Sequence, residues 1–262
     1  MQLTDNDWPG FDLTGQVAVI TGSSRGIGKW IALGLARAGA DILVTYQDHR
    51  GEGEEICRQI EALGRRAHLT KVDVTDTASI EAMVRTAVEE LGTVDIMVNN
   101  AGINVRKTAL EMTPDEFDTV TAVNARGVYF GCQAAARVMK ERGGGKIINM
   151  ASAAAFLVRR GLPLSVYAMT KAGVVMLTKA LAAEWAVYGI NVNAVAPGYF
   201  ATPLTQDRIS DPQALRTILE FTPLGRVGGA RDLVGAVVFL ASASADFITG
   251  QTLAIDGGRT VL

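Results

Sequence analysis

Tyr167 and Lys171 are four residues apart in a stretch with helical periodicity, so their side chains are expected to share one helix face. A phenol has an ordinary pKa of about 10 and is a poor base at neutral pH. A neighbouring ammonium favours the phenolate and moves this pKa toward a range useful for acid–base catalysis. The pair therefore predicts proton transfer at a substrate oxygen. Taken alone, a Tyr-x-x-x-Lys pair also occurs in ordinary helix packing.

Ser152 follows a short apolar run and supplies a hydroxyl that can donate a hydrogen bond. Such a donor stabilises the charge that develops on a substrate oxygen during hydride transfer. A lone serine carries little information, so this prediction depends on the residues that accompany it.

A glycine-rich loop, Thr21-Gly22-Ser23-Ser24-Arg25-Gly26-Ile27-Gly28, connects an apolar run to a helical stretch. In that context glycines allow a tight turn and close approach to a pyrophosphate, which the helix N-terminus attracts. The spacing is GxxxGxG and lacks the GK[ST] ending of a phosphate-transfer loop. The same residues also fit the GxSxG elbow of a hydrolase, with Ser24 as nucleophile. That alternative needs a histidine base, and the chain has only His49 and His68.

Short apolar runs alternate with helical stretches along the chain. The predicted strands are Val17–Ile20, Ile42–Tyr46, His68–Val72, Ile96–Val98, Ile147–Met150, Val192–Val195 and Leu253–Ile255. The predicted helices include Ile27–Ala38, Ile80–Leu91, Phe117–Lys140 and Val174–Val187, and Thr113-Pro114-Asp115-Glu116 has the pattern of a capping box. Strands that are apolar throughout predict a parallel sheet buried on both faces and built from βαβ units. We expect a doubly wound α/β Rossmann-type fold in one domain, residues 1–262, with residues 199–229 as a substrate lid.

Composition limits the class of protein. The chain has 262 residues, 48% of them apolar, and a formal net charge of -2, so neither nucleic acid nor an anionic membrane is expected as a partner. Only two cysteines are present, Cys57 and Cys132, which suggests neither a disulfide framework nor a metal site. The first nine residues contain acids where a signal peptide has bases, and no uncharged apolar run of about 18 residues exists. We expect a cytoplasmic protein.

Several further motifs follow the predicted strands in order. They are Asn99-Asn100-Ala101-Gly102, Ser152, Tyr167-Ala-Met-Thr-Lys171, Pro197-Gly198 and Asp256-Gly257-Gly258. With the glycine loop, they resemble the short-chain dehydrogenase/reductase family from about Leu13 to Gly258, with seven parallel strands flanked by helices. The resemblance implies a hydride exchange between a nicotinamide cofactor and a secondary alcohol or ketone.

The resemblance also assigns roles. Tyr167 is the general acid/base, Lys171 lowers its pKa and holds the ribose, and Ser152 orients the substrate. Asn124 is expected at a water relay behind the lysine. One departure concerns the 14 residues between Ser152 and Tyr167, about two more than the family pattern; we interpret residues 156–164 as a longer loop over the substrate pocket.

The cofactor-binding residues implied by the resemblance lie at the carboxyl ends of the strands. They are Gly22, Ser24, Arg25, Gly26, Ile27, Gly28, Tyr46, Gln47, Asp73, Val74, Asn100, Ala101, Gly102, Tyr167, Lys171, Pro197, Gly198 and Thr202. An acid at the position of Tyr46 would favour NAD, and Arg25 offers a partner for a 2′-phosphate. We expect NADP rather than NAD, although Gln47 stands where a basic residue is usual and Asp48 is close. No metal is expected.

The substrate is less defined. The chain looks most similar to bacterial sugar-acid dehydrogenases of the gluconate type and to 3-oxoacyl-carrier-protein reductases, so a small sugar acid or polyol is expected and a 3-oxoacyl thioester is the alternative. Arg106, Lys107, Arg159 and Arg160 are candidates for carboxylate recognition. A non-catalytic dinucleotide-sensing protein on the same fold is the alternative from another class. Relatives are commonly tetramers, so we expect a homotetramer formed through the helices at 117–140 and 165–188.

Overall fold

Seven parallel strands form one sheet in the computed structural model, which describes residues 10–262. The strands are β1 (Val17–Ile20), β2 (Asp41–Tyr46), β3 (Ala67–Lys71), β4 (Ile96–Asn99), β5 (Gly145–Met150), β6 (Ile190–Pro197) and β7 (Thr252–Ile255). Their order across the sheet is β3-β2-β1-β4-β5-β6-β7. The chain reverses direction across the sheet between β1 and β4. In doubly wound sheets this switch point is where a crevice for ligands opens at the carboxyl ends of the strands.

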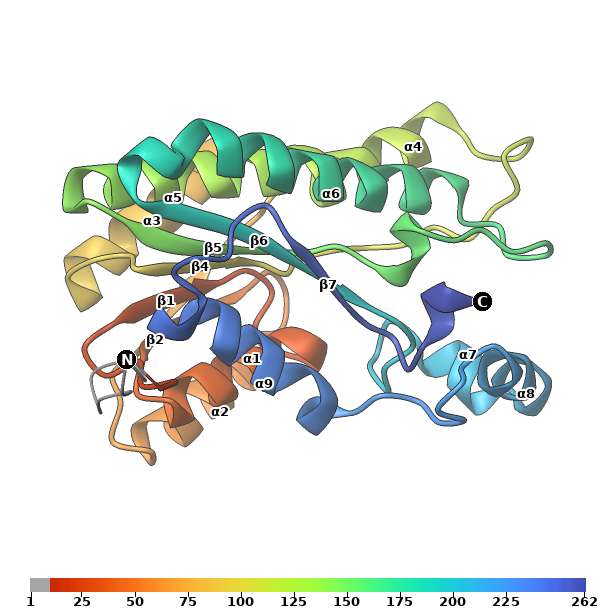
Figure 1. Cartoon of the computed structure of the whole chain (residues 1–262), viewed down its shortest axis with the longest axis horizontal. Coiled ribbons are helices and arrows are strands. Elements are labelled where there is room, and N and C mark those ends of the chain that lie inside the picture. Colours follow the sequence, from red (N-terminus) through yellow and green to blue (C-terminus); the bar gives the residue numbers. More distant parts are fainter. Residues whose placement is uncertain (1–9) are drawn as a thin grey trace, which may run out of the picture.

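Helices cover both faces of this sheet (Figure 1). The helices are α1 (Gly26–Arg37), α2 (Arg50–Glu61), α3 (Thr77–Leu91), α4 (Pro114–Thr121), α5 (Gly127–Arg142), α6 (Ser165–Trp185), α7 (Gln206–Ser210), α8 (Pro212–Glu220) and α9 (Ala230–Ala241). One face carries α3, α4, α5 and α6, and the other carries α1, α2 and α9, while α7 and α8 project at one end (Figure 1). The expected doubly wound α/β fold is confirmed.

The core has two halves, one on each side of the sheet. On β1, Val17 and Val19 belong to the cluster under α3, α5 and α6, whereas Ala18 and Ile20 belong to the cluster under α1, α2 and α9. All four β1 side chains are buried, as expected for a central parallel strand with helices on both faces. This packing holds the carboxyl ends of β1 and β4 in a rigid position.

The predicted helix over 117–140 differs from the structure. The helix begins earlier, at Pro114, after the predicted capping box at Thr113, and a π-helical turn at Ala122–Arg126 separates α4 from α5. Such a turn inserts one extra residue into a helix and is frequent at functional sites. It contains Asn124, whose side chain is fully buried rather than facing solvent. Two helices, α2 and α9, were not among the predicted ones.

The segment expected as a lid, residues 199–229, contains α7 and α8. Both ends of the segment meet at the sheet, because Gly228 N donates to Tyr199 O at 2.9 Å and Ala201 N donates to Gly228 O at 3.2 Å. The two ends of the segment are therefore hydrogen-bonded to each other, and α7 and α8 lie between them in the chain. Residues 156–164 contain no helix or strand and form an extended loop before α6.

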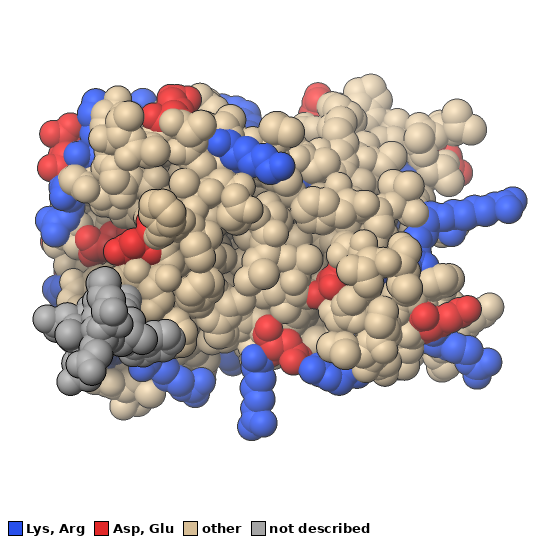
Figure 2. All heavy atoms as spheres, viewed as in Figure 1, with Lys and Arg blue, Asp and Glu red and all other residues tan. Residues whose placement is uncertain are grey.

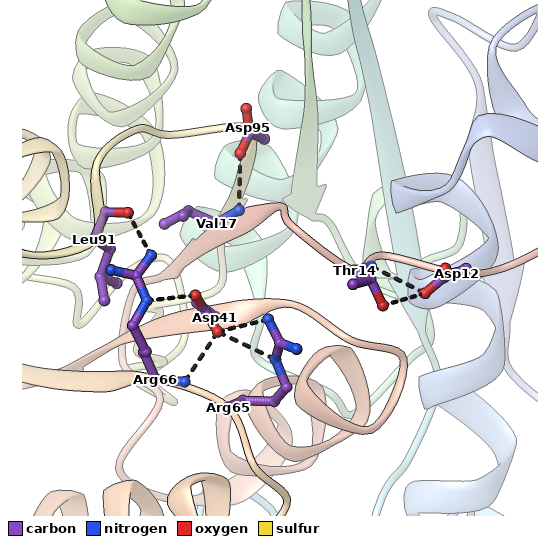
Figure 3. Close-up of polar contacts among 8 residues, drawn as sticks. All are labelled: Asp12, Thr14, Val17, Asp41, Arg65, Arg66, Leu91 and Asp95. Carbon is purple, nitrogen blue, oxygen red and sulfur yellow. Dashed lines mark hydrogen bonds and ion pairs between the residues drawn. The ribbon is translucent and has the colours of Figure 1, made fainter.

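The amino ends of the strands are held by buried polar contacts (Figure 3). The Asp41 carboxylate accepts hydrogen bonds from the side chain and backbone N–H of Arg66 at 2.7 and 2.9 Å, and pairs with Arg65 at 2.9 Å. Asp95 accepts from Val17 N at 2.8 Å. Burial would raise the pKa of Asp41, but the bonds to Arg66 and the charge of Arg65 hold it below its ordinary value. These contacts anchor the end of the sheet opposite the strand carboxyl ends.

The surface is mixed in charge. On the face drawn in Figure 2, Lys and Arg side chains are interspersed with Asp and Glu, mostly near the rim. Within the described residues, one helical stretch, Ser165–Tyr188, is long and apolar enough to cross a membrane, a test that core helices of soluble proteins also pass. Its residues Val174 and Leu181 belong to the core cluster on the sheet. The N-terminal segment used to predict the cellular location, residues 1–9, lies outside the described residues.

Candidate active site

The glycine loop joins β1 to α1 as expected. Gly22 and Gly26 have φ values of +64° and +59°, a left-handed conformation that glycine adopts without strain. The residue before α1, Arg25, makes no side-chain capping hydrogen bond, so the first N–H groups of the helix remain available to an anion. A side chain at Gly28 would meet Gly22 O at 2.3 Å, so glycine is required there for close packing of loop and helix.

Asn100 ties this loop to the end of β4. Its side-chain nitrogen donates to Thr21 O at 2.9 Å and to Gly22 O at 3.1 Å, while Thr21 Oγ1 accepts from the backbone N–H groups of Asn100 and Ala101. The neighbouring Asn99 points the other way, into the core, and donates to Asn149 Oδ1 at 2.9 Å. The two asparagines of the motif thus have different tasks: Asn100 shapes the cleft and Asn99 joins two strands.

A cleft of about 530 Å³ runs along the carboxyl ends of the strands. The predicted cofactor residues that line it are Gly22, Ser24, Arg25, Gly26, Ile27, Gln47, Val74, Asn100, Ala101, Gly102, Tyr167, Lys171, Pro197, Gly198 and Thr202. Gly28, Tyr46 and Asp73 do not line it. Gly28 acts through packing, Tyr46 ends β2, and the Asp73 carboxylate accepts from Thr75 N and Oγ1 at 2.8 and 2.7 Å. Glycine turns with a free helix N-terminus fit the pyrophosphate of a dinucleotide.

Sequence reasoning missed several residues of this cleft. They are His49, Ile103, Val123, Met150, Ala151, Phe200, Pro203, Leu204 and Thr205. Most of them are apolar and line the cleft through packing, which their spacing in the sequence does not indicate. His49 follows the predicted second strand closely, so its place after a strand end could have suggested it. Asp48, which the sequence placed close to the cofactor, also lines the cleft.

Ser152 and Tyr167 lie together despite the 14 residues between them. Their side chains form a hydrogen bond with one another, and Ser152 Oγ also accepts from Ala154 N at 3.2 Å. Both residues line the cofactor cleft and also a second cavity of about 820 Å³. Their hydroxyls therefore stand where the two cavities meet. Extended loop residues, including Leu157 and Arg159, line the second cavity.

The electrostatics of Tyr167 differ from the expectation. Burial raises the pKa of Tyr167, while the hydrogen bond from Ser152 and the charge of Arg106 oppose that increase. Lys171 is not among the groups that lower this pKa. Its Nζ lies 5.8 Å from the centre of the Tyr167 ring, and burial lowers the pKa of Lys171 itself to about 8. Desolvation thus outweighs the expected attraction between this ammonium and the phenolate.

Lys171 and Asn124 border the same small space. Lys171 Nζ donates to Met150 O at 2.7 Å. Asn124 locks the neighbouring loop, because its side chain accepts from Ile103 N at 2.9 Å and donates to Ile103 O at 2.8 Å. A Cβ added to Gly102 would lie 3.4 Å from Asn124 Oδ1 and 3.5 Å from Lys171 Nζ. The π-helical turn therefore brings Asn124 behind the lysine.

The larger cavity is lined by four guanidinium groups, those of Arg106, Arg159, Arg208 and Arg259, and by one carboxylate, Asp207. Arg106 forms an ion pair with Asp207, which also lines the cavity. Of the predicted carboxylate-binding residues, only Arg106 and Arg159 line the cavity. Lys107 pairs with Glu116 instead, and Arg160 is exposed.

The alternative with Ser24 as a nucleophile finds no base. His49 Nδ1 faces Glu52 at 3.7 Å and His68 Nδ1 faces Glu90 at 3.6 Å, and neither histidine hydrogen-bonds Ser24 in the described part of the chain. Without that contact the serine has no group to take its proton. Within residues 10–262, no group of three or more His, Cys, Asp or Glu residues could hold a metal ion.

Known proteins resemble this chain over nearly its whole length. A family model described as enoyl-(acyl carrier protein) reductase matches residues 22–260. A 2-dehydro-3-deoxy-D-gluconate 5-dehydrogenase of Escherichia coli (strain K12) is 44% identical over 95% of this chain and 96% of that protein. A 3-oxoacyl-[acyl-carrier-protein] reductase of Synechocystis is 36% identical over 95% of this chain and 98% of that protein.

A solved structure shares the fold closely. The crystal structure of a gluconate 5-dehydrogenase from Burkholderia cenocepacia, in complex with NADP and tartrate, is 42% identical, covers 96% of this chain and 98% of that chain, and gives a TM-score of 0.91. The motif order, the seven-stranded sheet and these similarities agree with one another. The chain therefore belongs to the short-chain dehydrogenase/reductase family and is an NAD(P)-dependent oxidoreductase that acts on CH–OH groups.

Proposed function

We propose that this protein is a sugar-acid dehydrogenase that interconverts a secondary alcohol and a ketone on a small polyhydroxy carboxylate. The main support for this proposal is that Ser152 and Tyr167 lie where the cleft that fits a dinucleotide meets a cavity lined by four arginines. An anionic substrate suits that lining, because guanidinium groups bind carboxylates through paired hydrogen bonds. The relatives named as gluconate-type dehydrogenases support the same substrate class.

In this proposal the proton moves at the Tyr167 hydroxyl. A raised pKa keeps the phenol protonated at neutral pH, so Tyr167 is ready to protonate the oxygen of a ketone undergoing reduction. In the oxidative direction the same group must accept a proton, which higher pH favours. Ser152 donates to the substrate oxygen and stabilises its developing charge. A nicotinamide bound in the cleft supplies or accepts the hydride.

Lys171 and Asn124 support the tyrosine. One hydrogen of the Lys171 ammonium is held by Met150 O, which leaves the others for ribose hydroxyls and for the proton path. Asn124 keeps the loop at Ile103 in place and borders the space beside Gly102, the route we propose for a water relay. Asn100, Ala101 and Gly102 form the floor of the cofactor cleft in this assignment.

We propose NADP as the preferred cofactor. Arg25 is exposed at the cleft and forms no ion pair within the described residues, so it is available to a 2′-phosphate. No acid stands at the end of β2, where Tyr46 is found. Gln47 adds a neutral donor, whereas Asp48 opposes a phosphate. The NADP complex of the 42% identical dehydrogenase supports this assignment.

A 3-oxoacyl thioester reductase is the second candidate. The observation in its favour is the apolar wall of the larger cavity, formed by Leu157, Val158, Leu162 and Leu204, which would suit an acyl chain. The similarity to the Synechocystis reductase points the same way. The arginines suit a free carboxylate better than a neutral acyl chain, and for this reason the sugar acid is preferred.

We also propose a single catalytic domain spanning residues 1–262, with residues 199–229 as the lid. A homotetramer is proposed because large apolar side chains are exposed on the two predicted interface segments, residues 117–140 and 165–188. They are Phe117, Tyr129, Met169, Met176, Val187 and Tyr188. A cytoplasmic location is proposed from the composition and from Cys57 and Cys132, which are both free thiols. Light scattering of the purified protein tests the assembly.

The function is tested by following the absorbance of reduced nicotinamide. The assay presents NADPH and NADH with 5-keto-D-gluconate, simple diketones and a 3-oxoacyl thioester. Wild type is compared with Tyr167→Phe, which removes one hydroxyl, and with Tyr129→Phe, which removes an exposed hydroxyl on α5. We expect turnover of the keto acid, lost in Tyr167→Phe by at least about 10²-fold and kept in Tyr129→Phe.

Other outcomes discriminate between the alternatives. Preference for the thioester would favour the acyl reductase. Cofactor binding without turnover of any substrate in wild type would favour the sensing protein. Full activity in Tyr167→Phe would overturn the proposed chemistry.

A further inference from the structure

Unpartnered polar atoms concentrate in the larger cavity. Four buried side-chain atoms lack a hydrogen-bond partner within the described residues, and three of them, Asn104 Oδ1, Arg159 Nε and Arg208 Nε, belong to residues that line this cavity. Buried polar groups are nearly always satisfied in proteins, and an unpaired one destabilises the folded state. Two of these atoms, the arginine Nε–H groups, are donors and one, Asn104 Oδ1, is an acceptor, so a polar ligand with matching acceptors and a donor would complement this side of the cavity.

We propose that Arg159 and Arg208 together bind the carboxylate of the substrate, and that Asn104 accepts a hydrogen bond from one of its hydroxyl groups. This inference rests on the proposed function and names the residues that select an acid over a neutral polyol. It assigns a role to the extended loop between Ser152 and Tyr167, which carries Arg159. Arg208 comes from α7 of the lid.

The other two arginines of the cavity are already engaged. Arg106 forms an ion pair with Asp207. Arg259 is 4% exposed, donates to Ile218 O and Phe221 O at 3.3 Å, and lies over the Tyr199 ring at 4.8 Å. No ion pair to Arg159 or Arg208 is formed within the described residues, so these two keep their positive charge for a ligand.

The position of Arg159 is well defined. Its guanidinium carbon lies 3.6 Å from the centre of the Phe221 ring, which follows α8. Arg259 in turn donates to the Phe221 carbonyl, so the turn after α8 sets the place of Arg159. Burial lowers the pKa of Arg259, and repulsion from Arg159 lowers it further; a bound carboxylate would relieve this repulsion.

The reacting end of the substrate is expected elsewhere in the cavity. Ser152 and Tyr167 line both cavities, whereas Arg159 and Arg208 line only the larger one. A substrate with its carboxylate between Arg159 and Arg208 would therefore present a carbon remote from the acid group to Tyr167 and Ser152. Because Arg159 lies on the loop and Arg208 on the lid, the carboxylate would also join these two walls.

The test uses two ligands that differ only in the acid group, D-gluconate and D-glucitol. Dissociation constants are measured calorimetrically with NADPH present, since reduced cofactor accepts no hydride and the ligand is not consumed. The oxidation rate of each ligand with NADP⁺ is measured in parallel. The variants are Arg159→Gln and Arg208→Gln, with Arg160→Gln as the matched control on the exposed neighbouring position.

We expect wild type and Arg160→Gln to bind D-gluconate more tightly than D-glucitol. This selectivity should fall by about 10- to 100-fold in each of Arg159→Gln and Arg208→Gln. Asn104→Ala should weaken both ligands. Selectivity within twofold of wild type in Arg159→Gln and Arg208→Gln would overturn the subsite.

The proposed function fails separately from the subsite. If wild type binds D-gluconate selectively but oxidises neither ligand, and the two arginine variants lose the selectivity, then the anion subsite stands and the assigned reaction is wrong. If wild type oxidises D-gluconate and the arginine variants do so with unchanged selectivity, then the reaction stands and the subsite is wrong. Absence of any D-gluconate binding in wild type contradicts both.

Discussion

Lys171 carries a buried ammonium, and replacing it by methionine should change how stability depends on pH. The side chain is 3% exposed, and its only hydrogen-bond partner among the described residues is Met150 O at 2.7 Å. Burial lowers the pKa of Lys171 from 10.5 to about 8. The native protein therefore releases this proton at a lower pH than the unfolded chain does.

The sign and size of the effect follow from proton linkage. Between about pH 8 and 10.5 the unfolded chain binds a proton that the native state has lost, so the free energy of unfolding increases with pH. One pKa unit corresponds to about 1.4 kcal/mol, and the gain from pH 7.5 to 9.5 comes to about 2 kcal/mol. Lys171→Met has no proton to release and should not show this gain.

The change in the free energy of unfolding is measured by urea unfolding followed by circular dichroism, at pH 7.5 and 9.5 and at one protein concentration. Other groups titrate equally in all variants, so the informative quantity is the wild-type free energy of unfolding minus that of Lys171→Met. It should rise by about 2 kcal/mol between the two pH values. Lys179→Met, at an exposed position on the same helix, should follow wild type. If the free energy of unfolding of wild type minus that of Lys171→Met is the same at both pH values, then burial does not lower the pKa of Lys171 and the reasoning is refuted.

Three further outcomes are expected. Gly28→Ala should lose at least about 10-fold in NADPH affinity, measured by fluorescence titration, because its Cβ would meet Gly22 O at 2.3 Å. A Cβ at Gly235 meets no atom within 4 Å, so Gly235→Ala should instead raise the free energy of unfolding by about 0.5–1 kcal/mol. Asp41→Asn should lower the free energy of unfolding by about 1–3 kcal/mol at pH 7. The wild-type carboxylate stabilises the native state only while it is ionised, and its pKa is lowered in that state. The difference in free energy of unfolding between wild type and variant, measured by urea titration, should therefore narrow below about pH 4. Arg25→Gln should reduce the kcat/KM preference for NADP over NAD by about 10-fold, and an unchanged ratio would contradict the assignment of Arg25 to the 2′-phosphate.

Local patterns were enough to predict most of the fold. All seven strands were predicted with boundaries within two residues of those observed, because a parallel strand buried on both faces is a short apolar run in any context. The cap at Thr113 was also confirmed, since its hydrogen bonds join residues three apart. The π-helical turn at Asn124 was missed, because one inserted residue shifts the apolar pattern by a single position and the two helical stretches therefore have the pattern of a single helix.

The site was predictable where chemistry depends on neighbours in sequence. Tyr167 and Lys171 share a helix face by spacing alone, and the glycine loop is continuous in the chain. The direction of the shift in the Tyr167 pKa was not predictable, because desolvation depends on how many atoms from residues remote in sequence surround the phenol.

The arginines of the larger cavity show which features the sequence determined and which depended on the tertiary structure. The sequence by itself determined that charged residues follow the fourth and fifth strands, and hence that an anionic substrate was a reasonable expectation. Only the tertiary structure decided that Arg159 enters the cavity while its neighbour Arg160 is exposed, and that Arg208 joins it from 49 positions further along the chain. Spacing along a helix or strand fixes direction through backbone periodicity. In a loop no such period exists, so side-chain direction is set by packing against residues that are remote in sequence.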